Sequence, residues 1–147
     1  MDPLTIPYYK QETTYTCGPA ALRMVLAYYG ILKTEEELRE HMRVSFSGTC
    51  NDMLAETAAL FRPCTAQVGL LFEHMLRHMV EGKPVLVNYI NPLSGQGHFA
   101  VAVGHTDTHL VLQDPNNGAG YEIEQRVFEE RWVSGDGQYR RWGLMFH

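Results

Sequence analysis

The residue types that could do chemistry begin with a cysteine close to the start of the chain. Cys17 opens an apolar run, and Gln11 stands six residues before it. A thiol at the amino end of a helix lies at the positive end of the helix dipole, which favours the nucleophilic thiolate. The side-chain N–H groups of Gln11, together with the backbone N–H of Cys17, could stabilise a developing oxyanion. We therefore expect Cys17 to be a nucleophile and Gln11 an oxyanion donor.

A histidine and an aspartate far along the chain could complete this chemistry. His98 begins an apolar run directly after the glycine-containing segment 91–97, a rim position where a side chain can meet substrate. If the strand that starts at His98 forms a hairpin with strand 109–113, residue 98 lies opposite Asp114 or the residue after it. A carboxylate in that place orients the imidazole and stabilises its charged form. We expect His98 to be the base and Asp114 the orienting residue.

Two glycines adjoin these candidates. Gly18 follows Cys17 and Gly97 precedes His98. Neither has a side chain, so we expect both to border the substrate and leave room for its backbone. A lone cysteine on an apolar helix is more often a packing residue. The neighbouring Gln11 and Gly18 favour the catalytic interpretation.

The other cysteines and histidines give weaker signals. Cys50 and Cys64 suit small buried apolar positions, with one disulfide between them as the alternative. His74 and His78 have the spacing of a metal-binding pair on one helix face. The sequence places no acidic or thiol ligand to complete that site, so we interpret them as a solvated or half-buried face. We expect neither a metal nor a cofactor.

Composition restricts the class of protein. The chain has 147 residues, which predicts one domain over 1–147, and its formal net charge of -5 does not favour a nucleic-acid partner. No apolar run approaches the roughly 18 residues of a membrane span, and no signal peptide is visible. An odd, low count of three cysteines fits a reducing compartment, so we expect a cytoplasmic protein. The oligomeric state is left open.

Apolar periodicity and helix-end signals divide the chain into a helical half and a strand-rich half. Helices are predicted at 17–29, 35–42, 51–61 and 71–80. Gly30 is placed to end the first helix, and Thr34 with Glu37 matches a capping box for the second. Asn51 and Asp52 are candidate caps for the third.

The second half is rich in short β-branched runs. Strands are predicted at 84–90, 98–104, 109–113, 121–123 and 139–146, with a helix near 124–132. Helices first and strands later predict an α+β domain, with the amino-terminal helical half packed on a carboxy-terminal antiparallel sheet.

On these residues the chain resembles the C39 type of papain-fold cysteine peptidases, bacterial enzymes that remove double-glycine leaders from bacteriocins and quorum peptides. The family pattern is a Gln, five residues, Cys-Gly-Pro or Cys-Gly-Ala, then His-Phe, then Asp-Pro. The matching residues are Gln11, Cys17-Gly18-Pro19, His98-Phe99 and Asp114-Pro115. Segment 123–132 resembles the short family helix that ends in Phe and Trp. The resemblance covers nearly the whole chain and implies a papain-like fold with a peptide or protein substrate.

The chain also departs from the bacteriocin-processing members. Those are usually the amino-terminal domain of an ABC exporter, whereas this sequence has no transmembrane helices and no nucleotide-binding P-loop. Segment 91–97 is longer and richer in glycine than a tight approach to the catalytic histidine, so we expect a different substrate cleft.

Three functions remain open at this stage. The first is peptide-bond hydrolysis through a thioacyl intermediate, with Gly-Gly leader cleavage as one form. The second is an isopeptidase or a transpeptidase of the phytochelatin-synthase kind, in which an amine or thiol replaces water. The third is a peptide-binding or effector module without turnover. Some relatives that only bind peptide have lost the cysteine, so the presence of Cys17 argues against the third.

Overall fold

The computed structural model describes residues 2–147, and the helices within this range lie where the sequence predicts them. Their bounds are α1 Cys17–Tyr28, α2 Glu35–Met42, α3 Asn51–Ala59, α4 Phe72–Val80 and α5 Gln125–Arg131. Gly30 follows α1 with a φ of 80°, a conformation that glycine adopts without strain. The capping box of α2 is present, with the Glu37 N–H donating to Thr34 Oγ1 at 3.1 Å. No helix in this range is long and apolar enough to cross a membrane.

The start of α3 differs from the prediction. Cys50, not Asn51 or Asp52, is the N-cap residue, and its side chain makes no capping bond. Asn51 is only 5% exposed, and its Nδ2 donates to Oδ1 of Asn88 at 3.4 Å. The predicted caps are therefore wrong, because the Asn51 amide joins α3 to the neighbouring sheet instead of capping its own helix.

Within residues 2–147 six strands form one antiparallel sheet in the order β1-β6-β2-β3-β4-β5. Their bounds are β1 Cys64–Gln67, β2 Val85–Ile90, β3 Gly97–His105, β4 His109–Asp114, β5 Gly118–Glu124 and β6 Gly143–Phe146. The sequence did not predict β1. This strand is short and mostly exposed, and it pairs with β6 at the sheet edge, so it lacks the alternating apolar pattern of a half-buried strand.

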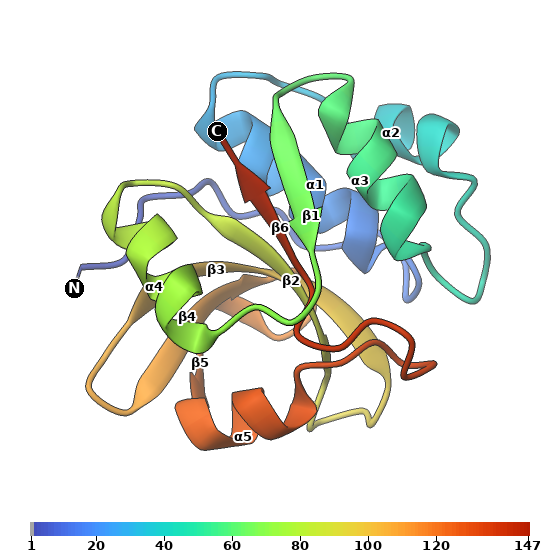
Figure 1. The fold of residues 1–147 in the computed structure, drawn as a ribbon. Coiled ribbons are helices and arrows are strands. Elements are labelled where there is room, and N and C mark those ends of the chain that lie inside the picture. The colour runs from blue at the N-terminus through green and yellow to red at the C-terminus, as the bar shows by residue number, and fades with distance from the viewer. Residues whose placement is uncertain (1) are drawn as a thin grey trace.

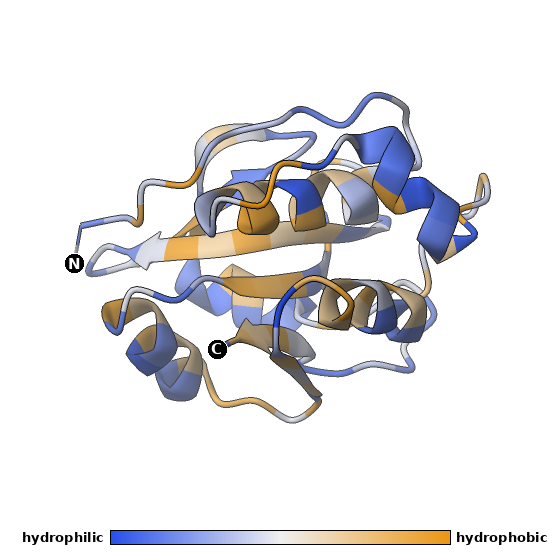
Figure 2. Cartoon of the chain, turned by 90° about the horizontal axis from the view of Figure 1, so that it is seen from above, coloured by the Kyte–Doolittle hydropathy of each residue, from blue (hydrophilic) through white to orange (hydrophobic). Residues whose placement is uncertain are grey.

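The sheet separates two hydrophobic cores (Figure 1). Helices α1, α2 and α3 cover one face and pack on strand residues such as Leu86 and Val101. Helices α4 and α5 cover the other face and pack on Val87, Tyr89 and Ala100. Figure 2 shows the apolar residues concentrated in the central strands and on the helix faces turned toward them. The predicted packing of the amino-terminal helices on the sheet holds for α1 to α3, whereas α4 lies on the opposite face.

The β3–β4 hairpin has a different register from the predicted one. A bulge before Gly104 shifts the pairing by one residue, and the ladder ends at the pair Val101 and Gln113. Residue 98 lies beyond this ladder, and continuing the Val101–Gln113 register would set it opposite residue 116, one step from the predicted position. His98 and Asp114 nevertheless meet through their side chains, just beyond the last ladder pair.

Candidate active site

Cys17 is the first residue of α1 and lines a cleft of about 440 Å³. It is a free thiol with 9% of its surface exposed. Thr16 stands at the N-cap, but its side chain makes no capping bond with the helix; its hydroxyl oxygen instead accepts from the Thr13 N–H at 3.1 Å. The positive end of α1 is therefore next to the thiol, as the sequence predicts.

His98 lies at the start of β3 and is 6% exposed. Its Nε2 is 2.6 Å from Asp114 Oδ1, and the Cys17 side chain is close enough to the imidazole to affect its pKa. Burial alone would lower the pKa of His98. The hydrogen bond to Asp114, the nearby Cys17 side chain and the attraction of the imidazolium to both outweigh burial and raise that pKa to about 9. The imidazole is therefore protonated at neutral pH.

Asp114 ends β4 and is fully buried, yet it is surrounded by donors. Its Oδ1 accepts from His98 and from the backbone N–H groups of Asn116 and Asn117, at 3.0 and 2.8 Å. Its Oδ2 accepts from the Tyr89 hydroxyl at 2.6 Å. Burial raises the pKa of Asp114, but the hydrogen bond and charge of His98 and the other donors lower it below its usual value. The carboxylate is thus held ionised inside the protein.

Gln11 lies in a loop that is fixed at both sides. Its backbone N–H donates to the Pro115 carbonyl at 2.9 Å, next to Asp114, and the following N–H, of Glu12, donates to the buried carboxylate of Glu35 at 3.1 Å. The Gln11 side chain does not use its amide on the thiol here: Nε2 donates to the Thr13 carbonyl at 2.7 Å. Its Oε1 is buried and without a hydrogen-bond partner. The role of Gln11 as oxyanion donor stays a prediction.

The cleft runs between two loops that flank Cys17. One wall is residues 47–51, before and at the start of α3, and the other includes residues 134–136 and 138–139. Gly97 lines the cleft, and a Cβ there would lie 2.7 Å from the Gly135 nitrogen; its contact with substrate stays a prediction. The two glycines let the second loop approach β3 closely.

Gly18 has a different place from the predicted one. Within the part of the chain that the structure describes, it is not among the residues that line the cleft. A Cβ at Gly18 would lie 2.7 Å from Thr49 Oγ1 and 2.9 Å from Thr49 Cβ. Glycine is needed there because Thr49 packs against α1, so the contact of Gly18 with substrate stays a prediction.

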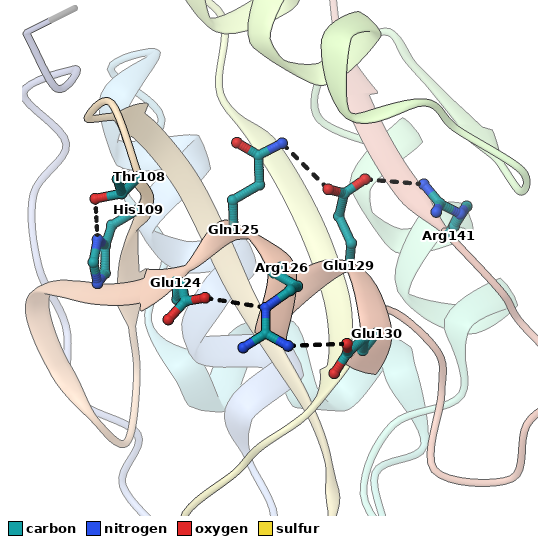
Figure 3. A pocket seen from close by; sticks show the side chains of 8 residues that line it. All are labelled: Thr108, His109, Glu124, Gln125, Arg126, Glu129, Glu130 and Arg141. Atoms are coloured by element: carbon teal, nitrogen blue, oxygen red, sulfur yellow. Dashed lines mark hydrogen bonds and ion pairs between the residues drawn. The ribbon is translucent and has the colours of Figure 1, made fainter.

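A larger hollow, of about 800 Å³, lies elsewhere, over β4, β5 and α5 (Figure 3). Its charges bind one another: Arg126 pairs with Glu124 and Glu130, and Arg141 pairs with Glu129. It contains no cysteine and none of the triad candidates. The chemistry therefore points to the smaller cleft at Cys17.

The other two cysteines and His78 lie outside the candidate triad. Cys50 is exposed and lines the cleft, so its predicted burial is wrong, while Cys64 is half-buried; both are free thiols. His78 bonds the Phe146 carbonyl at 3.0 Å, and burial lowers its pKa. Among residues 2–147 no cluster of three or more His, Cys, Asp or Glu side chains could hold a metal ion.

Sequence reasoning missed the residues that support the triad from behind. Tyr89 and Asn117 bond Asp114, and Asn88 Nδ2 donates to the His98 carbonyl at 3.1 Å. Tyr89 and Asn88 lie within an apolar strand run, where a tyrosine is a normal strand residue. A polar Asn88 in that run was the one available signal, because a buried amide needs partners.

The comparison with protein families identifies the class. The model of the Peptidase_C39 like family matches residues 3–139, nearly the whole chain, so this protein belongs to that family. No curated protein matches the chain. The family assignment agrees with the resemblance drawn from Gln11, Cys17, His98 and Asp114.

Solved structures show the same fold. A protein from Bacillus anthracis described as a C39-like peptidase superposes with a TM-score of 0.81 at 16% identity, covering 100% of this chain and 98% of its own. The peptidase domain of Streptococcus ComA, a bifunctional ABC transporter in a quorum-sensing pathway, superposes with a TM-score of 0.75 at 21% identity. The match covers 95% of this chain and 96% of the ComA domain. A double-glycine motif protease from an AMS/PCAT transporter, in complex with the leader peptide, superposes with a TM-score of 0.73 at 21% identity. The match covers 98% of this chain and 92% of that protease. The chain thus has the α+β papain-like fold of C39 peptidase domains.

Proposed function

We propose that this protein is a cysteine peptidase that cleaves peptide bonds through a thioacyl-enzyme intermediate. The observation that carries the proposal is the bond of His98 to the buried Asp114, together with the Cys17 thiol that acts on the same imidazole and lines a cleft. A protonated imidazole beside a thiol stabilises the thiolate, which is the nucleophile. Asp114 bonds Nε2 of His98, which leaves the other ring nitrogen for the sulfur.

The proposed reaction has two halves. Cys17 Sγ attacks the peptide carbonyl, the carbonyl oxygen becomes an oxyanion, and the backbone N–H of Cys17 with the Gln11 amide stabilises it. The C–N bond then breaks as His98 gives its proton to the leaving amine. Water attacks the thioester while His98 takes its proton, the C–S bond breaks, and the acid product leaves with the Cys17 thiolate and the protonated His98 restored.

The substrate class follows from the cleft and from the relatives. The residues that line the cleft include Gly48, Gly97 and Gly135, and its charged lining residue is Asp136. A cleft with backbone exposed at several glycines suits an extended peptide that bonds through its main chain. Because similar structures include a double-glycine motif protease bound to a leader peptide, we propose peptides with Gly-Gly at the scissile bond as the first substrates to test.

The decisive experiment is cleavage of a peptide library with product identification by mass spectrometry, comparing wild type with Cys17→Ala. We expect cleavage by wild type and none by Cys17→Ala, whose fold is checked by circular dichroism. A Cys17→Ala variant as active as wild type would refute the assignment of Cys17 as the nucleophile.

Added glutathione distinguishes a hydrolase from an acyl-transferring transpeptidase. Peptidyl-glutathione products would show an acyl transferase, whereas free acids show a hydrolase. Peptide binding with no product from wild type would show a binding module without turnover.

A further inference from the structure

The oxygen of Asp114 that faces away from His98 is bonded by a residue with no part in the reaction proposed above. Tyr89 Oη donates to Asp114 Oδ2 at 2.6 Å. Both side chains are fully buried. A hydrogen bond to a buried charged group is stronger than one between neutral groups, and leaving that oxygen without its donor is costly.

The direction of this hydrogen bond is fixed by a third residue. Asn117 Nδ2 lies 3.3 Å from Tyr89 Oη, 3.2 Å from Asn91 Oδ1 and 3.5 Å from Asp114 Oδ2, where the hydroxyl at 2.6 Å is the closer donor. An amide N–H can only donate, so the tyrosine oxygen accepts from Asn117 and its single proton goes to Asp114. The hydroxyl therefore cannot turn away from the carboxylate without losing both bonds.

The ring of Tyr89 is held as firmly as its hydroxyl. Tyr89 and His98 are direct cross-strand partners in the β2–β3 ladder, and their rings meet edge to face with centroids 5.8 Å apart. On another side, the Tyr89 ring contacts Phe128 of α5, also at 5.8 Å. One side chain thus contacts the imidazole through its ring and the carboxylate through its hydroxyl.

We propose that Tyr89 is a positioning residue of the candidate triad: its hydroxyl fixes the plane of the Asp114 carboxylate so that Oδ1 faces His98. The inference rests on the proposed peptidase function for its catalytic consequence, but not for its effect on the thiol. Two donors are needed because rotation of the carboxyl about its Cβ–Cγ bond would move Oδ1 away from Nε2. The backbone N–H groups at Asn116 and Asn117 hold Oδ1, and Tyr89 holds Oδ2.

The other titratable groups around Asp114 do not duplicate this bond. Besides His98 of β3 and Tyr89 of β2, the carboxylate faces Tyr8 of the amino-terminal segment and Tyr121 of β5, and its charge contributes to raising the pKa of both. Tyr8 Oη donates to the Asp114 backbone carbonyl at 2.7 Å, not to the carboxylate. Tyr89 is the tyrosine that bonds Oδ2 among the described residues.

The test is Tyr89→Phe, which keeps the ring and removes the hydroxyl. Two readouts are used: kcat and KM on a peptide found by the library experiment, and the rate at which iodoacetamide alkylates Cys17 from pH 4 to 10, followed by peptide mapping. We expect kcat to fall about tenfold or more with KM within about twofold, because the bond acts on the triad and not on substrate binding. We also expect the acid limb of the alkylation profile to move to higher pH, because Asp114 without this donor takes up a proton more readily.

The matched control is Tyr28→Phe, which removes a tyrosine hydroxyl bond of the same 2.6 Å length, to the Gly82 carbonyl away from the cleft. It should leave kcat and the alkylation profile unchanged. Tyr89→Phe with wild-type kcat and an unmoved acid limb would overturn the inference, as would equal changes in Tyr28→Phe.

Two further arms keep the test decisive. If Tyr89→Phe does not fold, Asn117→Ala removes the amide that bonds both the Tyr89 hydroxyl and Asp114 Oδ2. It should move the acid limb in the same direction; no movement overturns the inference. If wild type cleaves no peptide, the proposed function fails, and the alkylation profile alone then supports or overturns the role of Tyr89.

Discussion

The two sides of the candidate site are organised in opposite ways. On the base side, both oxygens of Asp114 and the ring of His98 are bonded by strand and turn residues, including Tyr89. On the nucleophile side, the Gln11 amide bonds its own loop, and buried oxygens of Gln11 and Thr49 have no partner.

The base side and the nucleophile side therefore differ in how completely their polar groups are hydrogen-bonded. A buried polar atom without a partner is costly and is rare in folded proteins. A base must be oriented before substrate arrives, so its bonds are already made. On the nucleophile side, the Gln11 amide N–H donates to the Thr13 carbonyl, so this bond must be given up before Gln11 can act as the proposed oxyanion donor. The pre-organised part of the candidate site is therefore the base side.

The largest loss of activity is expected from a substitution on the base side of the candidate site. Asp114→Asn keeps the shape and removes the charge that raises the pKa of His98. We expect kcat to fall about 10²–10⁴-fold, with the Cys17 alkylation rate at neutral pH falling as well. Asp107→Asn, at the exposed β3–β4 turn, is the matched control. Wild-type kcat in Asp114→Asn would contradict the triad.

A substitution of Gln11 tests the nucleophile side of the candidate site. Gln11→Glu keeps the shape but replaces the N–H donor with a carboxylate, so we expect kcat to fall about 10²–10³-fold. Unlike Asp114→Asn, it should leave the alkylation of Cys17 by iodoacetamide nearly unchanged at neutral pH, because no oxyanion forms in that reaction. Gln67→Glu on the exposed edge strand β1 is the control. Full activity in Gln11→Glu would remove Gln11 from the mechanism.

The pH dependence of activity and of the His98 titration tests the base side without a mutation. The pKa of His98 is raised to about 9, above the roughly 6.5 of an unfolded histidine. Its protonation therefore stabilises the fold fully below about pH 6.5, and this contribution is lost as the pH rises through 9. Activity should fall about tenfold per pH unit above 9, because deprotonated His98 cannot protonate the leaving amine. Nitrogen NMR of the His98 ring measures the titration; a midpoint near 6.5 would contradict the prediction.

The smallest effect concerns stability at Gly18. Gly18→Ala places a methyl group against Thr49, so we expect the free energy of unfolding to fall by about 1–3 kcal/mol. The double variant Gly18→Ala/Thr49→Gly removes the atoms in the way, and chemical denaturation should show a positive coupling between the two changes. Additive losses would show that the close approach to Thr49 does not explain this glycine.

Helix positions were predictable because their signals are local. Gly30, the Thr34–Glu37 capping box and the apolar spacing of 17–29 act within a few residues of each other. The exposed edge strand β1 and the bulge before Gly104 depend on pairing with distant segments. Local patterns do not encode such pairings.

The candidate site was predictable in part for the same reason. Cys17, His98 and Asp114 stand in short recognisable patterns, and the structure brings them together as expected. Tyr89 supports them through its hydroxyl, which no strand pattern distinguishes from an ordinary buried tyrosine. The close approach of Thr49 to Gly18 could not be predicted, because the two residues are distant in sequence.

The sheet that divides the protein into two cores also divides the candidate site. Cys17 belongs to the core under α1, α2 and α3, whereas Tyr89, which packs on His98, belongs to the core under α4 and α5. The thiol and the ring that packs behind the imidazole therefore come from opposite faces of the sheet, so the complete candidate site depends on the assembly of both layers.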